Sequence, residues 1–249
     1  MSGHSHWATI KRKKGAADAK RGKMFSKCAK AIIVAARMGG SDLSMNVRLR
    51  YAIDDAKSVN MPNVNIDRAI KKGSGELEGV HIEEVVYEGY GPGGVAILAE
   101  AMTDNRNRTA SEVTKVFERH GGNLGGPNCV AYMFSQKGVI TVTGVQDEEA
   151  LMDVALGAGA EDIHETDDGF EVIVLPDAFE AVKKALADAG ITVERAEISQ
   201  VPQTFVPLGE TDARKVLALL EGLEDHDDVQ KVHSNFDVAP DVLAKIQAG

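Results

Sequence analysis

The order of predicted strands and helices between residues 138 and 200 constrains the fold of this chain more than any other feature. The hydrophobic pattern there switches between short β-rich runs and helical spacing. The predicted elements are, in order, strand 138–143, helix 147–157, strands 161–165 and 170–175, helix 177–188 and strand 191–200. The order β-α-β-β-α-β is typical of a ferredoxin-like domain. We therefore predict a ferredoxin-like α+β domain over residues 137–201.

The segments on either side of this domain complete a second unit of similar type. The upstream elements are strands 84–90 and 94–102 joined by a Gly-Pro-Gly-Gly turn, a helix that begins near Asp104 or Asn105, and a strand near 130–135. The downstream elements are strand 203–207, helix 211–222 and strand 229–235. We predict a discontinuous α+β domain over residues 79–136 plus 202–249, with the third domain inserted into this second one.

Residues 1–78 have a different, all-helical character. Three helices are predicted, over residues 18–38, 46–60 and 63–72. Apolar residues at spacings of three and four give the first helix one apolar face, and glycines end the first and third helices. The predicted fold class is α+β with three domains. An N-terminal all-helical domain is followed by two ferredoxin-like α+β domains, the third inserted into the second.

Charge is divided unevenly between this helical domain, which we call the basic head, and the rest of the chain, which we call the acidic body. Residues 1–75 contain 16 Lys and Arg against 5 Asp and no Glu, whereas the remaining 174 residues contain 12 Lys and Arg against 33 Asp and Glu. A segment this cationic attracts phosphate backbones by Coulomb forces and by counterion release. Because the acidic body is repelled by the same polyanion, we predict that the head is the part that binds nucleic acid.

Two groups of side chains in the head are candidate nucleic-acid contacts. Four consecutive cations near an indole suit backbone neutralisation combined with stacking on an unpaired base. A lysine stripe follows the helical repeat of residues 18–38 on the side opposite the apolar face, and Val34 is its one apolar exception. The candidates are His4, Trp7, Lys11, Arg12, Lys13, Lys14, Lys20, Arg21, Lys23, Lys27 and Lys30. The alternative is a solvated charged face with Trp7 folded back on the helices.

Arg106 and Arg108 form a candidate anion site in the acidic body. Both fall in the first turn of a predicted helix, where cations oppose the helix dipole and free backbone N–H groups favour anions. An arginine pair in this position suits a phosphate or a carboxylate. The alternative is a helix capped by Asp104 whose arginines pair with local glutamates.

The remaining polar motifs have plainer interpretations. The glycine-rich loop His120–Gly126 connects a helix to a strand, the reverse of the order found in phosphate-binding loops, so its glycines are expected to serve conformation. The acidic segment Glu224–Asp228 is interpreted as a solvated turn in preference to a metal site. The sequence shows no motif for catalysis or cofactor binding, and we predict a non-enzymatic protein with no cofactor, no metal and no small-molecule substrate.

The N-terminal residues and the cysteines indicate a cytoplasmic protein. The chain begins without the apolar region of a secretory signal, and the longest apolar run in the head, Ala31–Ala36, is far short of the ~20 residues that span a membrane. The two cysteines are 101 positions apart and are interpreted as reduced core thiols. After removal of Met1, the sequence Ser2-Gly3-His4 offers an N-rich square plane to Cu(II) or Ni(II). We predict that such binding is adventitious.

Several long strings in this sequence resemble those of the YebC family. The strings are Gly3–Trp7, Ala17–Lys23, Asn60–Pro62, Ile70–Gly73, Tyr87–Gly94, Thr103–Thr109 and His120–Gly125. The resemblance covers essentially the whole chain. That family is described as probable transcriptional regulators and includes the mitochondrial translational activator of cytochrome c oxidase. The resemblance implies the same three-domain plan.

The resemblance also implies a function. Family members assist the synthesis of sequences that stall the ribosome, including proline-rich ones, so the first hypothesis is a monomeric, ribosome-associated translation factor that contacts ribosomal RNA or tRNA through the head. The alternative is a DNA-binding transcriptional regulator. Helices 46–60 and 63–72 could form a helix-turn-helix, but the second offers no evident base-reading face. Phosphate contacts position a protein without specifying sequence.

Overall fold

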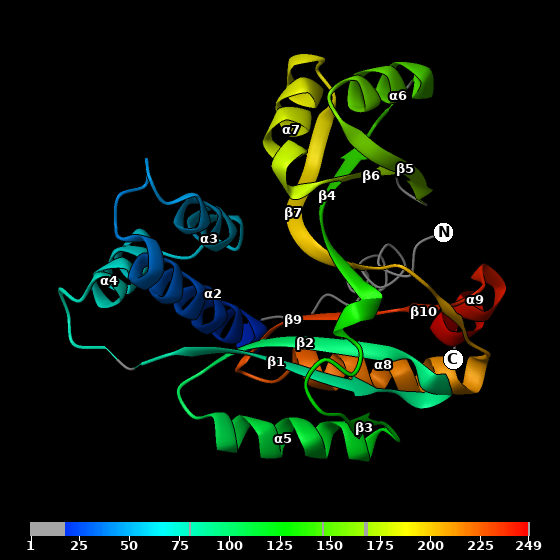
Figure 1. The fold of residues 1–249 in the computed structure, drawn as a ribbon, viewed down its shortest axis with the longest axis horizontal. Helices are drawn as coiled ribbons and strands as arrows, with labels where there is room; N and C mark the ends of the chain where they lie inside the picture. The colour runs from blue at the N-terminus through cyan, green and yellow to red at the C-terminus, as the bar shows by residue number, and fades with distance from the viewer. Residues whose placement is uncertain (1–17, 80, 146, 167–168, 249) are drawn as a thin grey trace.

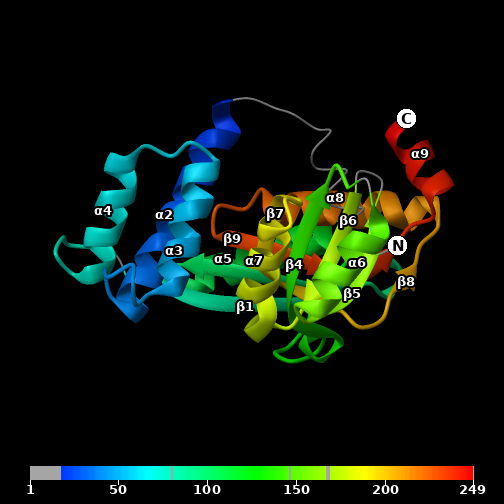
Figure 2. The same cartoon turned by 90° about the horizontal axis from the view of Figure 1, so that it is seen from above.

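The computed structural model of this protein describes residues 18–79, 81–145, 147–166 and 169–248 (Figure 1). It is an α+β structure in which a helical head is followed by two sheet-containing domains, as predicted. In Figure 2 the head lies at one end of the molecule and the C-terminal helix α9 (Pro240–Ala248) lies at the other.

The head contains α2 (Asp18–Gly39), α3 (Val47–Ser58) and α4 (Asn63–Ser74), which confirms the three predicted helices. Their apolar faces meet in a core that buries Ile32, Leu49 and Ile66. Asn46 fixes the start of α3, because its side-chain oxygen accepts from the backbone N–H of Leu49 at 2.9 Å. Its amide nitrogen also donates to two carbonyls at the end of α2, which joins the first two helices.

The second domain is one antiparallel sheet covered by two helices. Its elements are β1 (Glu83–Tyr90), β2 (Ala96–Thr103), α5 (Arg106–Arg119), β3 (Asn123–Leu124), α8 (Glu210–Glu224) and β9 (Val229–Ser234), with strand order β3-β1-β2-β9. Apolar residues of α5, α8 and one sheet face share a core around Phe117 and Leu220. The strand predicted at 203–207 is only β8 (Val206–Pro207), which pairs in parallel with β10 (Phe236–Asp237). Helix α9 was not predicted.

A buried carboxylate organises the segment that follows β3. Glu88 accepts hydrogen bonds from the backbone N–H groups of Asn128, Val130 and Ala131 at 2.7, 2.9 and 2.7 Å. Burial by itself raises the pKa of Glu88, but these three bonds outweigh it and hold the pKa below its ordinary value. Neighbouring Gly89 is needed for space, since a Cβ there would lie 2.5 Å from the carbonyl oxygen of Asn123.

The inserted domain is ferredoxin-like, as predicted. Its elements are β4 (Phe134–Thr143), α6 (Glu148–Gly157), β5 (Ala160–Thr166), β6 (Gly169–Val174), α7 (Phe179–Asp188) and β7 (Thr192–Pro202), with strand order β5-β6-β4-β7. The strand predicted near 130–135 is not separate, because residues 131–133 form a 3₁₀ turn and β4 runs on from Phe134. Since β4 and β7 pair from Phe134 and Pro202 onward, a continuous two-stranded ribbon joins the two domains.

Side-chain contacts connect all three parts of the molecule. Tyr51 of α3 hydrogen-bonds to Glu180 of α7, and its ring packs edge-on against Phe179. Between the two sheets, the ammonium of Lys231 donates to Glu197 at 2.8 Å. Within the part of the chain that the structure describes, no helix is long and apolar enough to cross a membrane.

Candidate nucleic-acid interface

The lysine stripe of α2 faces the acidic body. On the opposite side of the helix, Ile32, Ala35 and Ala36 are buried in the core of the head. On the stripe side, Val34 is buried as well, packed with Ile82 and Met102 of the body. The apolar exception noted in the sequence is therefore a second, smaller apolar contact that fixes which face of α2 meets the body.

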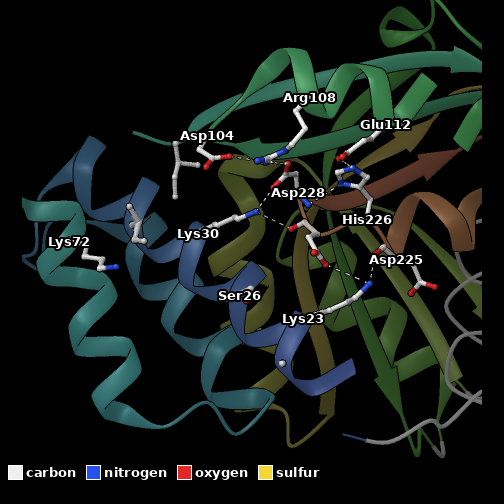
Figure 3. A pocket seen from close by; sticks show the side chains of 14 residues that line it. Lys23, Ser26, Lys30, Lys72, Asp104, Arg108, Glu112, Asp225, His226 and Asp228 are labelled. Atoms are coloured by element: carbon white, nitrogen blue, oxygen red, sulfur yellow. Dashed lines mark hydrogen bonds and ion pairs between the residues drawn. The ribbon is translucent and has the colours of Figure 1, made fainter. Parts of the chain in front are cut away.

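Three lysines of the stripe contact residues 224–228, the last residue of α8 and the turn that leads to β9, which we call the acidic loop (Figure 3). The ammonium of Lys27 donates to the carbonyl of Glu224 at 2.6 Å, and that of Lys23 donates to the carbonyl of Asp225 at 2.8 Å. These carbonyls end α8, where the helix dipole is negative and acceptors have no partner within the helix. Lys23 and Lys27 therefore supply hydrogen-bond donors to the free carbonyl groups at the C-terminal end of α8.

Asp228 is the centre of this contact, and it corrects the interpretation of residues 224–228 as a solvated turn. Its side chain is 4% exposed and forms an ion pair with Lys30. Its second oxygen accepts from Arg108 at 2.8 Å and from Thr109 at 2.7 Å. Burial raises the pKa of Asp228, but the hydrogen bonds from Lys30, Thr109 and Arg108 outweigh burial and hold the pKa well below its ordinary value.

The candidate anion site, Arg106 and Arg108, has carboxylate partners within the protein. Asn105 is the N-cap of α5, because its side chain accepts from the backbone N–H of Arg108 at 3.1 Å. The guanidinium of Arg108 donates to both Asp104 and Asp228 at 2.8 Å. Arg106 lies 3.7 Å from Glu83. An external phosphate at this site would have to compete with these carboxylates.

A cleft of about 870 Å³ separates the head from the acidic loop. In Figure 3, Lys23 and Lys30 reach across it from α2, Arg108 and Glu112 line it from α5, and Lys72 extends from α4 without joining the dashed interactions. His226 lies in its wall, with Nδ1 accepting from the backbone N–H of Asp228 at 3.1 Å and Nε2 lying 2.9 Å from Glu112. No group of three or more His, Cys, Asp or Glu in the described ranges could hold a metal ion.

Helix α4 carries three cations that are not among the predicted nucleic-acid contacts. Arg68, Lys71 and Lys72 are exposed, and among the residues the structure describes no carboxylate pairs with any of them. Their spacing of three and four along one helix was the available signal, but the mixture of polar residue types in this helix obscured it.

The other predicted contacts cannot be placed. His4, Trp7, Lys11, Arg12, Lys13 and Lys14 lie outside the described residues, and so does the predicted copper or nickel site at His4. The backbone of Lys20 is helical, and Arg21 is exposed at the start of α2. The described part of the head thus presents two cationic faces, one against the body and one on α4.

These features define a class of protein: a cationic helical head docked on an acidic body of two α+β domains, of which the inserted one has the ferredoxin-like order and the other runs β-β-α-β-α-β. Two family descriptions match this chain, "TACO1/YebC protein N-terminal domain" over residues 5–76 and "TACO1/YebC second and third domain" over residues 82–236. The chain belongs to the TACO1/YebC family.

Individual relatives match over almost the whole length. The chain is 52% identical over 248 residues to a "probable transcriptional regulatory protein" from Dictyoglomus turgidum, covering 99% of this chain and 100% of that protein. It is 55% identical over 248 residues to a protein of the same name from Syntrophobacter fumaroxidans, with the same two coverages of 99% and 100%. A crystal structure of a conserved hypothetical protein from Aquifex aeolicus matches with a TM-score of 0.84 and 50% identity, covering 94% of this chain and 98% of that one.

Proposed function

We propose that this protein is a non-enzymatic, nucleic-acid-binding regulator of gene expression that acts in the cytoplasm as a monomer. The observation that carries the proposal is the charge division, with 16 Lys and Arg against 5 Asp in residues 1–75 and 12 against 33 acids in the rest. Such a molecule approaches a polyanion head first, because the head is attracted and the body is repelled. The name of the relatives, probable transcriptional regulatory protein, supports a role in gene expression.

We further propose that the nucleic acid is RNA and that the protein is a ribosome-associated translation factor acting on stalling, proline-rich sequences. Residues 11–14 and Trp7 supply backbone neutralisation and stacking, which suit ribosomal RNA or tRNA with unpaired bases. Lys23, Lys27 and Lys30 contact the acidic loop, so their use on RNA requires that the head leave that loop. The exposed cations of α4 can contact RNA without this separation of the head from the acidic loop.

A DNA-binding transcriptional regulator is the second candidate, and the printed name of the relatives favours it. A helix-turn-helix protein places its second helix in the major groove. Helix α4 follows α3 after a short turn at Pro62 and would be that helix.

Sedimentation of a cell lysate separates these candidates. We expect the protein to sediment with ribosomes and to be released by RNase. Replacing Lys11, Arg12, Lys13 and Lys14 with Ala should remove it from the ribosomal fraction, and should reduce the salt dependence of RNA binding by ~0.7 in slope per lost phosphate contact.

The control is Lys115→Ala with Lys184→Ala, which removes two exposed cations from the body and should leave sedimentation unchanged. Release by DNase instead of RNase would establish the DNA-binding candidate. Sedimentation apart from both ribosomes and chromosomal DNA would refute the proposal as a whole.

A further inference from the structure

A groove of about 240 Å³ lies within the head, between α2 and α4. Its floor is apolar and its rim is polar. The floor residues are Phe25, Ala29, Ile33, Met61 and Ala69, and the rim residues are Ser26, Asn65, Arg68 and Lys72. Near one end the two helices touch at Gly73, where a Cβ would lie 2.5 Å from the carbonyl oxygen of Ile33. None of Lys23, Lys27 and Lys30 lines this groove, although Ser26, Ile33 and Lys72 line both the groove and the cleft beside the acidic loop.

The rim residues of α4 have unused binding capacity. Asn65, Arg68 and Lys72 follow one another at spacings of three and four, which places them on one side of the helix. In the described ranges, none of these three side chains has a hydrogen-bond or ion-pair partner. Arg68 and Lys72 are like charges four residues apart, an arrangement that costs a helix stability unless an anion lies between them.

We propose that this groove binds one unpaired nucleotide of single-stranded RNA. The base lies on the apolar floor against Phe25 and Met61, the amide of Asn65 hydrogen-bonds to its edge, and Arg68 and Lys72 hold the adjacent phosphates. Pockets for drug-sized ligands begin at about 300 Å³, so this smaller groove suits a single base. A base paired within a duplex cannot reach the floor, whereas unpaired RNA bases are recognised by such stacking and edge contacts. This proposal rests on the proposed function and specifies what the α4 face of the head binds.

Two neighbouring lysines provide a matched test. Lys71 and Lys72 are both exposed on α4 and carry the same charge, but only Lys72 lines the groove. Binding of a short, labelled single-stranded RNA is measured by fluorescence anisotropy at fixed salt, with the same RNA annealed to its complement for comparison. We expect Lys72→Ala and Arg68→Ala to weaken single-strand binding by about tenfold, and Lys71→Ala by no more than about twofold.

Asn65→Ala tests recognition of the base, because it changes no charge. We expect it to weaken single-strand binding by about fivefold without changing the salt dependence, as expected for the loss of a hydrogen bond. An independent measurement uses the unmutated protein. RNA containing a photoreactive uridine should cross-link to the peptides that contain Phe25 or Met61.

Equal losses for Lys71→Ala and Lys72→Ala, no effect of Asn65→Ala, or cross-links to neither the Phe25 peptide nor the Met61 peptide would overturn the groove proposal. Tighter binding to the duplex than to the single strand would overturn it too. Each of these results leaves the proposed function intact, since the unmutated protein still binds nucleic acid. The proposed function fails separately if the unmutated protein binds neither RNA nor DNA.

Discussion

Asp228→Asn should destabilise the protein by removing the anion on which the head and the body converge. The substitution keeps the shape of the side chain and replaces one oxygen with an NH₂ donor. Because Lys30, Arg108 and Thr109 all donate to this carboxylate, the new donor must face at least one of them. Two cations then also lose their shared counter-charge.

The size of the effect follows from burial on each side of the contact. Removing one partner of a fully buried, hydrogen-bonded ion pair costs about 3–5 kcal/mol. The side chain of Asp228 is almost fully buried, but those of Lys30 and Arg108 are 23% and 44% exposed and can be hydrated again. We therefore expect a loss of about 2–3 kcal/mol in the free energy of unfolding at pH 7. In a chain of this size that lowers Tm by roughly 5–10 °C.

Asp227→Asn is the matched control in the same loop. The side chain of Asp227 is 70% exposed and lies 3.6 Å from the ammonium of Lys23, so its substitution should change stability by less than about 0.5 kcal/mol. Both variants are compared with the parent by differential scanning calorimetry and by urea unfolding. An Asp228→Asn variant as stable as the Asp227→Asn variant would refute the reasoning.

The pH dependence tests the charge of Asp228 directly. The folded protein holds the pKa of Asp228 below its ordinary value, so the stabilisation is complete above the ordinary pKa of about 3.9 and is lost as pH falls towards the lowered pKa. Between pH 7 and pH 3 the unfolded chain takes up this proton while the folded chain does not. The stability difference between the parent and Asp228→Asn should therefore shrink by about 1.3 kcal/mol. A difference that stays constant would show that Asp228 is not ionised in this contact.

Two further predictions concern the head and the inserted domain. Asn46→Ala removes the cap of α3 and two hydrogen bonds to the end of α2. The free energy of unfolding, measured in urea by circular dichroism, should fall by about 2 kcal/mol. A fall of less than about 0.5 kcal/mol would contradict the capping role. Burial, with the nearby charge of Glu197, raises the pKa of Glu171 to about 7. Its contribution to stability is therefore greatest below its ordinary pKa and is lost as pH rises through 7, so Glu171→Gln should raise Tm at pH 8 and change it little at pH 4.

The elements predicted best are those with strong local signals. The helices of the head and the β-α-β-β-α-β order follow from hydrophobic spacing, which the backbone geometry converts directly into buried faces. The elements that were missed have weak local signals. β3 is two residues long and exists because it pairs with β1. β10 was also missed, and the strand predicted at 203–207 is only the two residues of β8 that pair with β10. Pairing of this kind depends on segments distant in the sequence.

The lysine stripe shows why charge spacing alone did not place the head on the body. Spacing identified a cationic face on α2, but a cationic face suits a nucleic acid and a helix C-terminus equally well. Val34 was the distinguishing residue, because a solvated face gains nothing from a fully buried valine. An apolar residue on a charged stripe therefore indicates a protein contact, and the three lysines around it reach the acidic loop.

In the Thr103–Thr109 segment, too, local sequence predicted the kind of contact but not the partner. Arginines beside the N-terminus of a helix indicate that an anion binds there, and the structure contains one, the carboxylate of Asp228. Thr103, Arg108 and Thr109 all donate to it. That carboxylate lies 120 residues further along the chain than Arg108, and it arrives because β9 pairs beside β2, which places the acidic loop next to the start of α5. Local sequence specified the chemistry of the site, while the identity of the anion depended on strand pairing. An external phosphate that binds Arg108 must therefore compete with the carboxylate of Asp228.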